Sequence, residues 1–160
     1  MSVAIHPVTT PDNDHSQDAQ PERQMKVVAF LCNWCSYAGA DKAGSNQLPV
    51  PEELSVIRIM CSGRLEPTMV LEAFQKGADG VMVLACHAGD CHYKEGNLRA
   101  FCRIELMQRM VPQLGIHPER LMLDCISAAE ADRYSAITKT FVARLRALSQ
   151  PQAACIGEKV

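Results

Sequence analysis

Five of the eight cysteines stand in three short motifs whose residue types suit metal or redox chemistry. CNWC (32–35) and CHAGDC (86–91) each hold two cysteines, and CSGR (61–64) holds one. Four thiolates that converge from separate loops suit a soft metal, either zinc or an iron–sulfur cluster, and a 2Fe-2S cluster needs four ligands. The spacing alone leaves three sites open: an iron–sulfur cluster, a structural zinc site and a thioredoxin-like dithiol.

Four other side chains in these motifs are candidates for supporting roles. His87 and His92 each follow a loop cysteine. Because the five cysteines exceed the four ligands that are needed, neither histidine is required as a ligand. We expect both to form hydrogen bonds around the ligands or to pack beside them. Arg64 would either stabilise negative charge on a thiolate-bound cluster or form an ordinary surface ion pair. Trp34 would shield a cluster from water or serve as a core or interface aromatic.

The remaining cysteines have less distinctive positions. Cys102 lies on a predicted helix beside its apolar face, and Cys125 ends a predicted strand. Because free cysteine is commonly a small buried hydrophobe, we expect both in the core, with Cys125 the better outside candidate for a ligand. Cys155 follows Pro151 near the C-terminus and is interpreted as an incidental surface thiol.

The elements that must position these motifs alternate between strands and helices. Four short apolar runs, each leading into a cysteine, predict strands buried on both faces, at 26–31, 55–60, 80–85 and 120–124. Helices are predicted at 67–77, at 97–114 with Pro112 shortening or bending it, and at 127–148 with a capping-box spacing of Ser127 and Glu130. A short helix and a loop are expected between the first two strands.

This alternation predicts an α/β fold: a doubly wound, Rossmann- or flavodoxin-like parallel sheet of about four strands with flanking helices. Ligands of such folds bind outside the carboxyl ends of the strands, and neighbouring strands lie about 4.8 Å apart. Cysteines 32 and 35, then 61, then 86 and 91 each follow closely after a strand. If those three strands are neighbours, five thiols converge on one small volume.

Composition narrows the class of protein. The 160 residues favour one domain at 25–149, with a flexible polar tail at 1–24 and a second tail at 150–160. The net charge of −2 and the lack of a basic block argue against nucleic acid as a partner. Neither a membrane span nor a secretory signal is evident. We therefore expect a cytoplasmic protein, whose thiols stay reduced.

Catalytic patterns are lacking in the sequence. No phosphate-binding glycine loop follows the first predicted strand, and no nucleophile, base and orienting acid stand out as a set. The sequence predicts a site that holds electrons, in a non-catalytic subunit of a larger oxidoreductase. Such a carrier must present its site to two neighbours, so we expect a stable complex that docks through the cysteine edge and Trp34.

The segments FLCNWCSYAGAD (30–41), IRIMCSGRLEP (57–67), GADGVMVLACHAGDCHYKEGN (77–97) and CISAAE (125–130) together resemble the hydrogenase iron–sulfur (delta) subunit family. MvhD, the delta subunit of the methyl-viologen-reducing hydrogenase of methanogens, gives this MvhD-like, HdrABC-associated family its name. The resemblance covers residues 26–148, and the long polar N-terminus departs from it.

The resemblance implies one 2Fe-2S cluster, bound by four of the five cysteines Cys32, Cys35, Cys61, Cys86 and Cys91. We expect Cys61, Cys86 and Cys91 to be ligands and one of Cys32 and Cys35 to complete the set. It also implies partners: a hydrogenase, formate dehydrogenase or other oxidoreductase module, and the flavin-containing HdrA component of heterodisulfide reductase, whose flavin bifurcates electrons.

Overall fold

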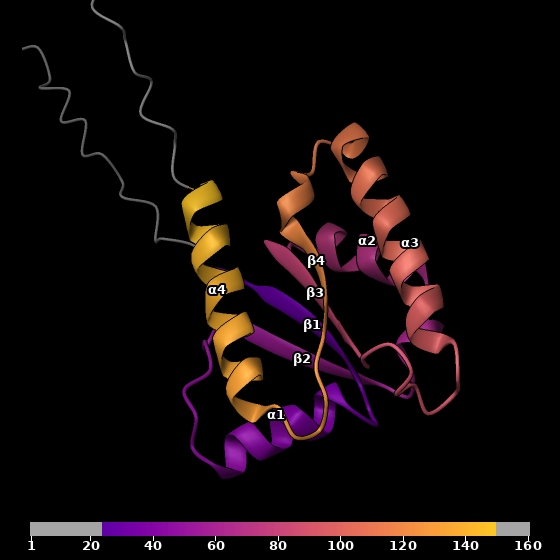
Figure 1. Cartoon of the computed structure of the whole chain (residues 1–160). Helices are drawn as coiled ribbons and strands as arrows, with labels where there is room; N and C mark the ends of the chain where they lie inside the picture. The colour runs from indigo at the N-terminus through magenta and orange to yellow at the C-terminus, as the bar shows by residue number, and fades with distance from the viewer. Residues whose placement is uncertain (1–23, 150–160) are drawn as a thin grey trace, which may run out of the picture.

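Residues 24–149, which a computed structural model describes, form a four-stranded parallel sheet with helices on both faces (Figure 1). The strands are β1 (Val27–Cys32), β2 (Leu54–Ile59), β3 (Gly80–Ala85) and β4 (Leu121–Cys125), in the order β2-β1-β3-β4. The predicted α/β class is confirmed. The predicted tails, 1–24 and 150–160, fall outside the described residues apart from residue 24.

β1 lies at the centre of the cysteine edge. It pairs in parallel with β2 on one side and with β3 on the other, with Val27 opposite both Leu54 and Gly80. The three strands that precede the cysteine motifs are therefore neighbours, as the convergence of the cysteines requires. Each strand begins within one residue of its predicted start.

The helices form two layers. Helices α1 (Ser36–Ser45) and α4 (Ala131–Ser149) cover one face of the sheet, and α2 (Pro67–Gln75) and α3 (Gly96–Met110) cover the other (Figure 1). Side chains of β1 alternate between the layers: Leu31 packs with α1 and α4, whereas Phe30 packs with α2 and α3. This alternation follows from the two-residue period of a strand.

The prediction that every strand is buried on both faces is wrong for β2. Val56 and Ile57 are each 42% exposed, because β2 is an edge strand that no helix covers fully. β4, at the opposite edge, is half-buried along most of its length. The central strand β3 is buried throughout, as predicted.

Two helix predictions need adjustment. α3 ends at Met110, and Pro112 lies in the 3-10 turn Val111–Leu114, so the predicted shortening occurs. α4 begins at residue 131 rather than at Ser127, although the Glu130 carboxylate accepts a hydrogen bond from the Ser127 N–H. Among residues 24–149, no helix has the length and apolar character that crossing a membrane demands.

Candidate metal centre

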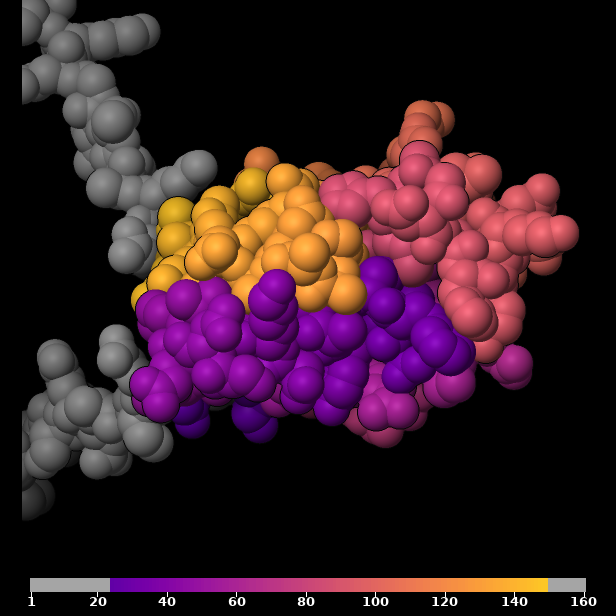
Figure 2. All heavy atoms as spheres, turned by 60° about the horizontal axis from the view of Figure 1, so that its bottom comes forward, coloured from indigo at the N-terminus to yellow at the C-terminus, as the bar shows by residue number. Residues whose placement is uncertain are grey.

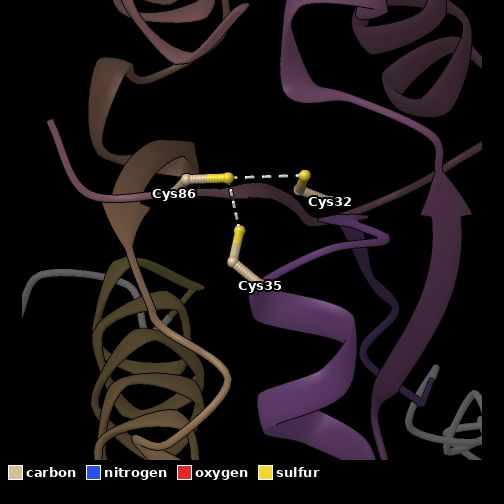
Figure 3. Close-up of side chains that lie close together, drawn as sticks. All are labelled: Cys32, Cys35 and Cys86. Atoms are coloured by element: carbon tan, nitrogen blue, oxygen red, sulfur yellow. Dashed lines mark hydrogen bonds between the residues drawn. The ribbon is translucent and has the colours of Figure 1, made fainter. Parts of the chain in front are cut away.

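Three cysteines meet where β1 and β3 end, and we call them the cysteine triad. Cys32 is the last residue of β1, Cys35 immediately precedes α1, and Cys86 follows β3. The Cys86 Sγ lies 3.6 Å from the Cys32 Sγ and 2.8 Å from the Cys35 Sγ. All three side chains are buried, and their sulfurs point toward one another (Figure 3).

The other two candidate ligands form a separate cysteine pair, Cys61 and Cys91. Cys61 follows β2, and Cys91 lies in the loop before α3. A Cβ added to Gly96 would collide with the Cys61 Sγ and lie 3.3 Å from the Cys91 Sγ. A Cβ on Gly63 would lie 2.7 Å from the Gly96 Cα. The two glycines therefore allow the Cys61 and Cys91 loops to approach each other closely.

The triad and the pair are close enough to influence each other. The Ser62 backbone contributes to the lowered pKa of Cys32, and negative charge on Cys32 helps to raise the pKa of Cys61. Figure 2 shows the residues that follow β1 (indigo) adjoining the loop before α3 (salmon) at one end of the molecule. The structure therefore brings all five predicted cysteines to one edge, as a group of three beside a group of two.

Electrostatics within the triad shift the pKa values of its members in opposite directions. Hydrogen bonds from the thiols of Cys35 and Cys86 lower the pKa of Cys32 to about 2. The interaction with Cys32 raises the pKa of Cys35 to about 12, and the pKa of Cys86 rises as well because it too donates to Cys32. Burial adds to both increases. Such crowding of thiols is relieved when a cation neutralises their charge.

In the cysteine pair, the pKa of Cys61 is raised and the pKa of Cys91 is lowered. Burial raises the pKa of Cys61, and the neighbouring Cys91 adds to the increase. Burial acts in the same direction on Cys91, but hydrogen bonds from the backbone N–H groups of Asn97, Tyr93 and Gly96 outweigh it and lower the pKa. Gly96 and Asn97 belong to the start of α3, where the helix dipole favours an anion. Cys91 is therefore prepared to carry negative charge.

Two buried polar residues that the sequence pattern did not reveal hold the cysteine loops. The Ser36 Oγ accepts a hydrogen bond from the Cys32 N–H (2.8 Å) and donates to the Leu84 carbonyl (2.6 Å). The Asn97 Nδ2 donates to the carbonyls of Cys86 (3.1 Å) and His87 (2.8 Å). Ser36 directly follows the CNWC motif, and Asn97 lies at the start of the helix after the CHAGDC motif. These positions next to the cysteine motifs were the signal available in the sequence.

The two histidines make contacts with neighbouring loops. The His87 Nε2 lies 2.6 Å from the Glu130 Oε2, and this contact, with the Ser127 N–H, lowers the pKa of Glu130 to about 2. The His92 ring stacks on Trp34 with centroids 3.8 Å apart and an angle of 13° between the planes. These contacts favour a supporting role for the histidines over metal ligation.

The other candidates lie at the margins of the site. Trp34 is 44% exposed, which favours its interpretation as an interface aromatic, and Arg64 is exposed. The Cys125 thiol is half-buried and donates to the Cys86 carbonyl at 3.2 Å, outside the triad and the pair. The core prediction for Cys102 is wrong, because this side chain is exposed on the outer side of α3 while Ile104 and Met107 are buried.

The residues at this edge fit a metal group with thiolate ligands. The donor set consists of soft sulfur atoms from converging loops, which zinc and iron–sulfur clusters prefer. Ser62, between the pair and the triad, is fully buried, and its Oγ has no hydrogen-bond partner among the described residues. A buried hydroxyl of this kind usually has a partner, so an additional acceptor beside it is expected.

Residues 27–149 match the family model described as the methyl-viologen-reducing hydrogenase, delta subunit. The chain belongs to this family. It is 45% identical over 127 residues to the iron-sulfur subunit of the F420-non-reducing hydrogenase of Archaeoglobus profundus, covering 79% of this chain and 93% of that one. It is 43% identical over 125 residues to the vhc iron-sulfur subunit of the F420-non-reducing hydrogenase of Methanococcus voltae, covering 78% and 87% of the two chains.

A third similarity is to part of a much longer protein. The chain is 47% identical over 119 residues to the A subunit of the ferredoxin:CoB-CoM heterodisulfide reductase of Methanosarcina mazei. The match covers 74% of this chain but only 15% of the relative. A segment similar to this chain therefore forms a small part of a longer subunit in that organism.

Proposed function

We propose that the chain is an electron-transfer subunit that carries one 2Fe-2S cluster. The observation that supports this most directly is the gathering of five cysteines from three neighbouring strand ends, as a triad and a pair. Relatives named as hydrogenase iron–sulfur subunits support an electron-transfer role. When bound, the cluster would supply one-electron redox chemistry that no side chain of the site can perform.

Four of the five cysteines would hold the cluster. We propose Cys61, Cys86 and Cys91, with one of Cys32 and Cys35 as the fourth. A 2Fe-2S cluster takes two ligands on each iron, so the pair would serve one iron and two members of the triad the other. The backbone N–H groups around Cys91 and the N–H of Ser62 would stabilise the negative charge of the bound thiolates.

The partners are proposed from the relatives. We propose that this chain relays electrons between a hydrogenase, formate dehydrogenase or other oxidoreductase module and an HdrA-like flavoprotein of an electron-bifurcating complex. The covalent linkage of a similar domain within the A subunit of a heterodisulfide reductase supports an HdrA-like neighbour, because fused domains work side by side. A cytoplasmic location agrees with the free thiols.

Metal analysis of anaerobically purified protein tests the cofactor. We expect about two iron atoms and two acid-labile sulfides for each chain, and an EPR signal on reduction that is typical of a 2Fe-2S centre. Zinc without iron or sulfide would instead indicate a zinc-stapled adaptor. A metal-free protein in which Cys32 and Cys35 cycle between dithiol and disulfide would indicate a thioredoxin-like function.

The state of the endogenous protein tests the partner proposal. We expect the chain to purify within a stable complex that contains a flavoprotein and a second oxidoreductase. Recovery of a free monomer that retains full electron-transfer activity would contradict the proposal.

A further inference from the structure

A surface cavity of about 600 Å³ reaches one of the five cysteines. It lies between the end of β2 and the start of α3, and Cys61 lines it although its side chain is only 5% exposed. Gly63 and Gly96 also line the cavity, and a Cβ added to Gly96 would collide with the Cys61 sulfur. A partner seated in the cavity would lie next to a proposed ligand of the cluster.

The rim of this cavity is positively charged. Arg64, Lys94 and Arg99 surround it with one carboxylate, Glu95, whose Oε2 lies 3.7 Å from the Arg99 Nη2. Neither Arg64 nor Lys94 forms an ion pair with any residue in 24–149. The whole chain has a net charge of −2, so the excess of cations here is local. A rim of this charge attracts a partner that presents carboxylates.

Large apolar side chains accompany these cations. Met60 and Tyr93 line the cavity and are 50% and 51% exposed, and Leu98 is 50% exposed on the first turns of α3 beside it. Cations around exposed apolar and aromatic side chains are typical of a protein interface, whereas a small anion would need no such apolar border. We call Met60, Arg64, Tyr93, Lys94, Leu98 and Arg99 the Cys61 face.

The backbone at Lys94 provides an independent observation. Its φ of +69° lies in the left-handed region, which is unfavourable for a lysine and suits glycine. The Lys94 N–H donates to the Cys91 carbonyl at 2.9 Å, so the turn is tied to the cysteine pair. Strained backbone of this kind is concentrated at functional sites, and here it places a cation at the rim of the cavity.

We propose that the Cys61 face is the docking surface for an electron-transfer protein that presents carboxylates around an apolar contact. The proposal rests on the proposed function, which makes Cys61 a ligand of the cluster. Docking here places the partner against the Cys61 side of the centre. The stacked Trp34 and His92 rings adjoin this face, because the His92 ring also meets the Tyr93 ring edge-on with centroids 5.0 Å apart.

Charge reversal tests the docking surface. The double variant Arg64→Glu/Lys94→Glu is compared with the control Lys139→Glu/Arg144→Glu, which makes the same charge change at exposed positions on α4. Binding of the cluster-loaded chain to the HdrA-like flavoprotein and to the hydrogenase-type module of the same organism is measured by biolayer interferometry. We expect at least about a tenfold loss of affinity for one of the two partners, a wild-type affinity that falls with salt, and a change below about threefold for the control.

Crosslinking tests the chemistry of the partner directly. A carbodiimide joins a lysine amine to a carboxylate in contact with it, and mass spectrometry identifies the joined residues. We expect Lys94 to be joined to an aspartate or glutamate of the partner whose affinity falls. Lys94→Gly removes the cation and relieves the backbone strain, so it should keep the fold and its thermal stability while losing both the crosslink and part of the affinity.

Iron, sulfide and EPR measurements on every variant separate the two proposals. Normal cluster content with affinity unchanged for both partners in Arg64→Glu/Lys94→Glu overturns the docking surface, as does a wild-type chain that binds neither partner. A chain without iron and sulfide overturns the proposed function, and the crosslink at Lys94 then still decides whether a carboxylate-bearing partner docks on this face. Equal losses in the double variant and the control also overturn the proposal.

Discussion

The cysteine triad and the cysteine pair lie at the same edge of the sheet but are held in different ways. The triad is built on the two central strands: Cys32 ends β1, Cys86 follows β3, and Ser36 ties the two strand ends together. The pair depends on the edge strand β2 and on the loop before α3. The positions of the triad are therefore fixed by the sheet, and those of the pair by contacts between loops.

This difference shows how one site combines a rigid framework with a cysteine that a surface cavity reaches. The triad is buried where β1 and β3 provide a framework covered on both faces. The pair is held by the facing backbones of Gly63 and Gly96, and a surface cavity reaches Cys61. We infer that the triad anchors the proposed centre and that the pair forms its side toward a partner.

Serine substitutions of the proposed ligands should have the largest effect. Cys61→Ser, Cys86→Ser and Cys91→Ser should each reduce iron from about two atoms for each chain toward none, because a 2Fe-2S cluster needs four ligands. Cys102→Ser and Cys125→Ser, which change cysteines outside both groups, should keep iron and sulfide near the wild-type content. Iron and sulfide assays on anaerobically purified protein measure these outcomes.

Cys32→Ser and Cys35→Ser sharpen the comparison within the triad. Since the proposed set takes one of these two residues, one variant should keep the cluster and the other should lose it. Retention in both single variants, or loss in both, would contradict the proposed division into two ligands from the pair and two from the triad.

Gly96→Ala should disturb the pair next most strongly. The added methyl group collides with the Cys61 Sγ and presses on the Cys91 Sγ, so the two loops must move apart. We expect the free energy of unfolding of the metal-free chain to fall by about 1–3 kcal/mol, the usual cost of overpacking, and the cluster content to fall with it. Chemical denaturation and iron assays measure the two effects.

The matched control is Gly44→Ala, where an added Cβ meets nothing within 4 Å in helix α1. It should keep the cluster and leave stability unchanged or increase it, because alanine favours helix. A Gly96→Ala protein with normal iron content would show that the pair does not need the close glycine contact.

Ser62→Ala should affect the metal-free and cluster-loaded chains differently. In the metal-free chain the buried hydroxyl has no partner among the described residues, so its removal should leave stability unchanged or raise it by about 1 kcal/mol. If the hydroxyl donates to the bound cluster, its loss should shift the reduction potential to more negative values, because hydrogen bonds to the sulfurs tune the potential. An EPR-monitored redox titration with Ser62→Thr as the conservative variant measures the shift.

The framework of this fold could be predicted from the sequence because its signals are local. The apolar runs at β1 and β3 are continuous and β-branched, and each leads directly into a cysteine motif. The convergence of five cysteines follows once the strands are parallel neighbours. What the runs could not show is that β2 lies at the edge, since strand order is a long-range property and an exposed edge strand can carry the same apolar residues.

The division of the cysteines into a triad and a pair could not be predicted from spacing. Cys86 and Cys91 are five residues apart in one motif, which predicts that they act together, yet they fall into different groups. The loop between them turns away from the triad toward α3, and contacts distant in sequence, such as Asn97 with Cys86, fix its path. The exposure of Cys102 escapes prediction for a similar reason, because α3 has apolar residues on its outer side as well as on its buried face.

A smaller effect on stability is expected from the contact between His87 and Glu130, which connects the loop after Cys86 to the start of α4. The contacts with His87 and the Ser127 N–H lower the pKa of Glu130 to about 2, below the ordinary value of 4.5. Because the folded-state pKa is the lower one, the stabilisation is fully present above about pH 4.5 and is lost as the pH falls toward 2. Glu130→Gln should therefore lower the melting temperature of the metal-free chain at pH 6, and its difference from the wild type should shrink steadily below pH 4.5. Asp132→Asn, on the first turn of α4 but outside this contact, is the matched control, and an equal pH dependence in both variants would show that the His87 contact does not couple α4 to the cysteine edge.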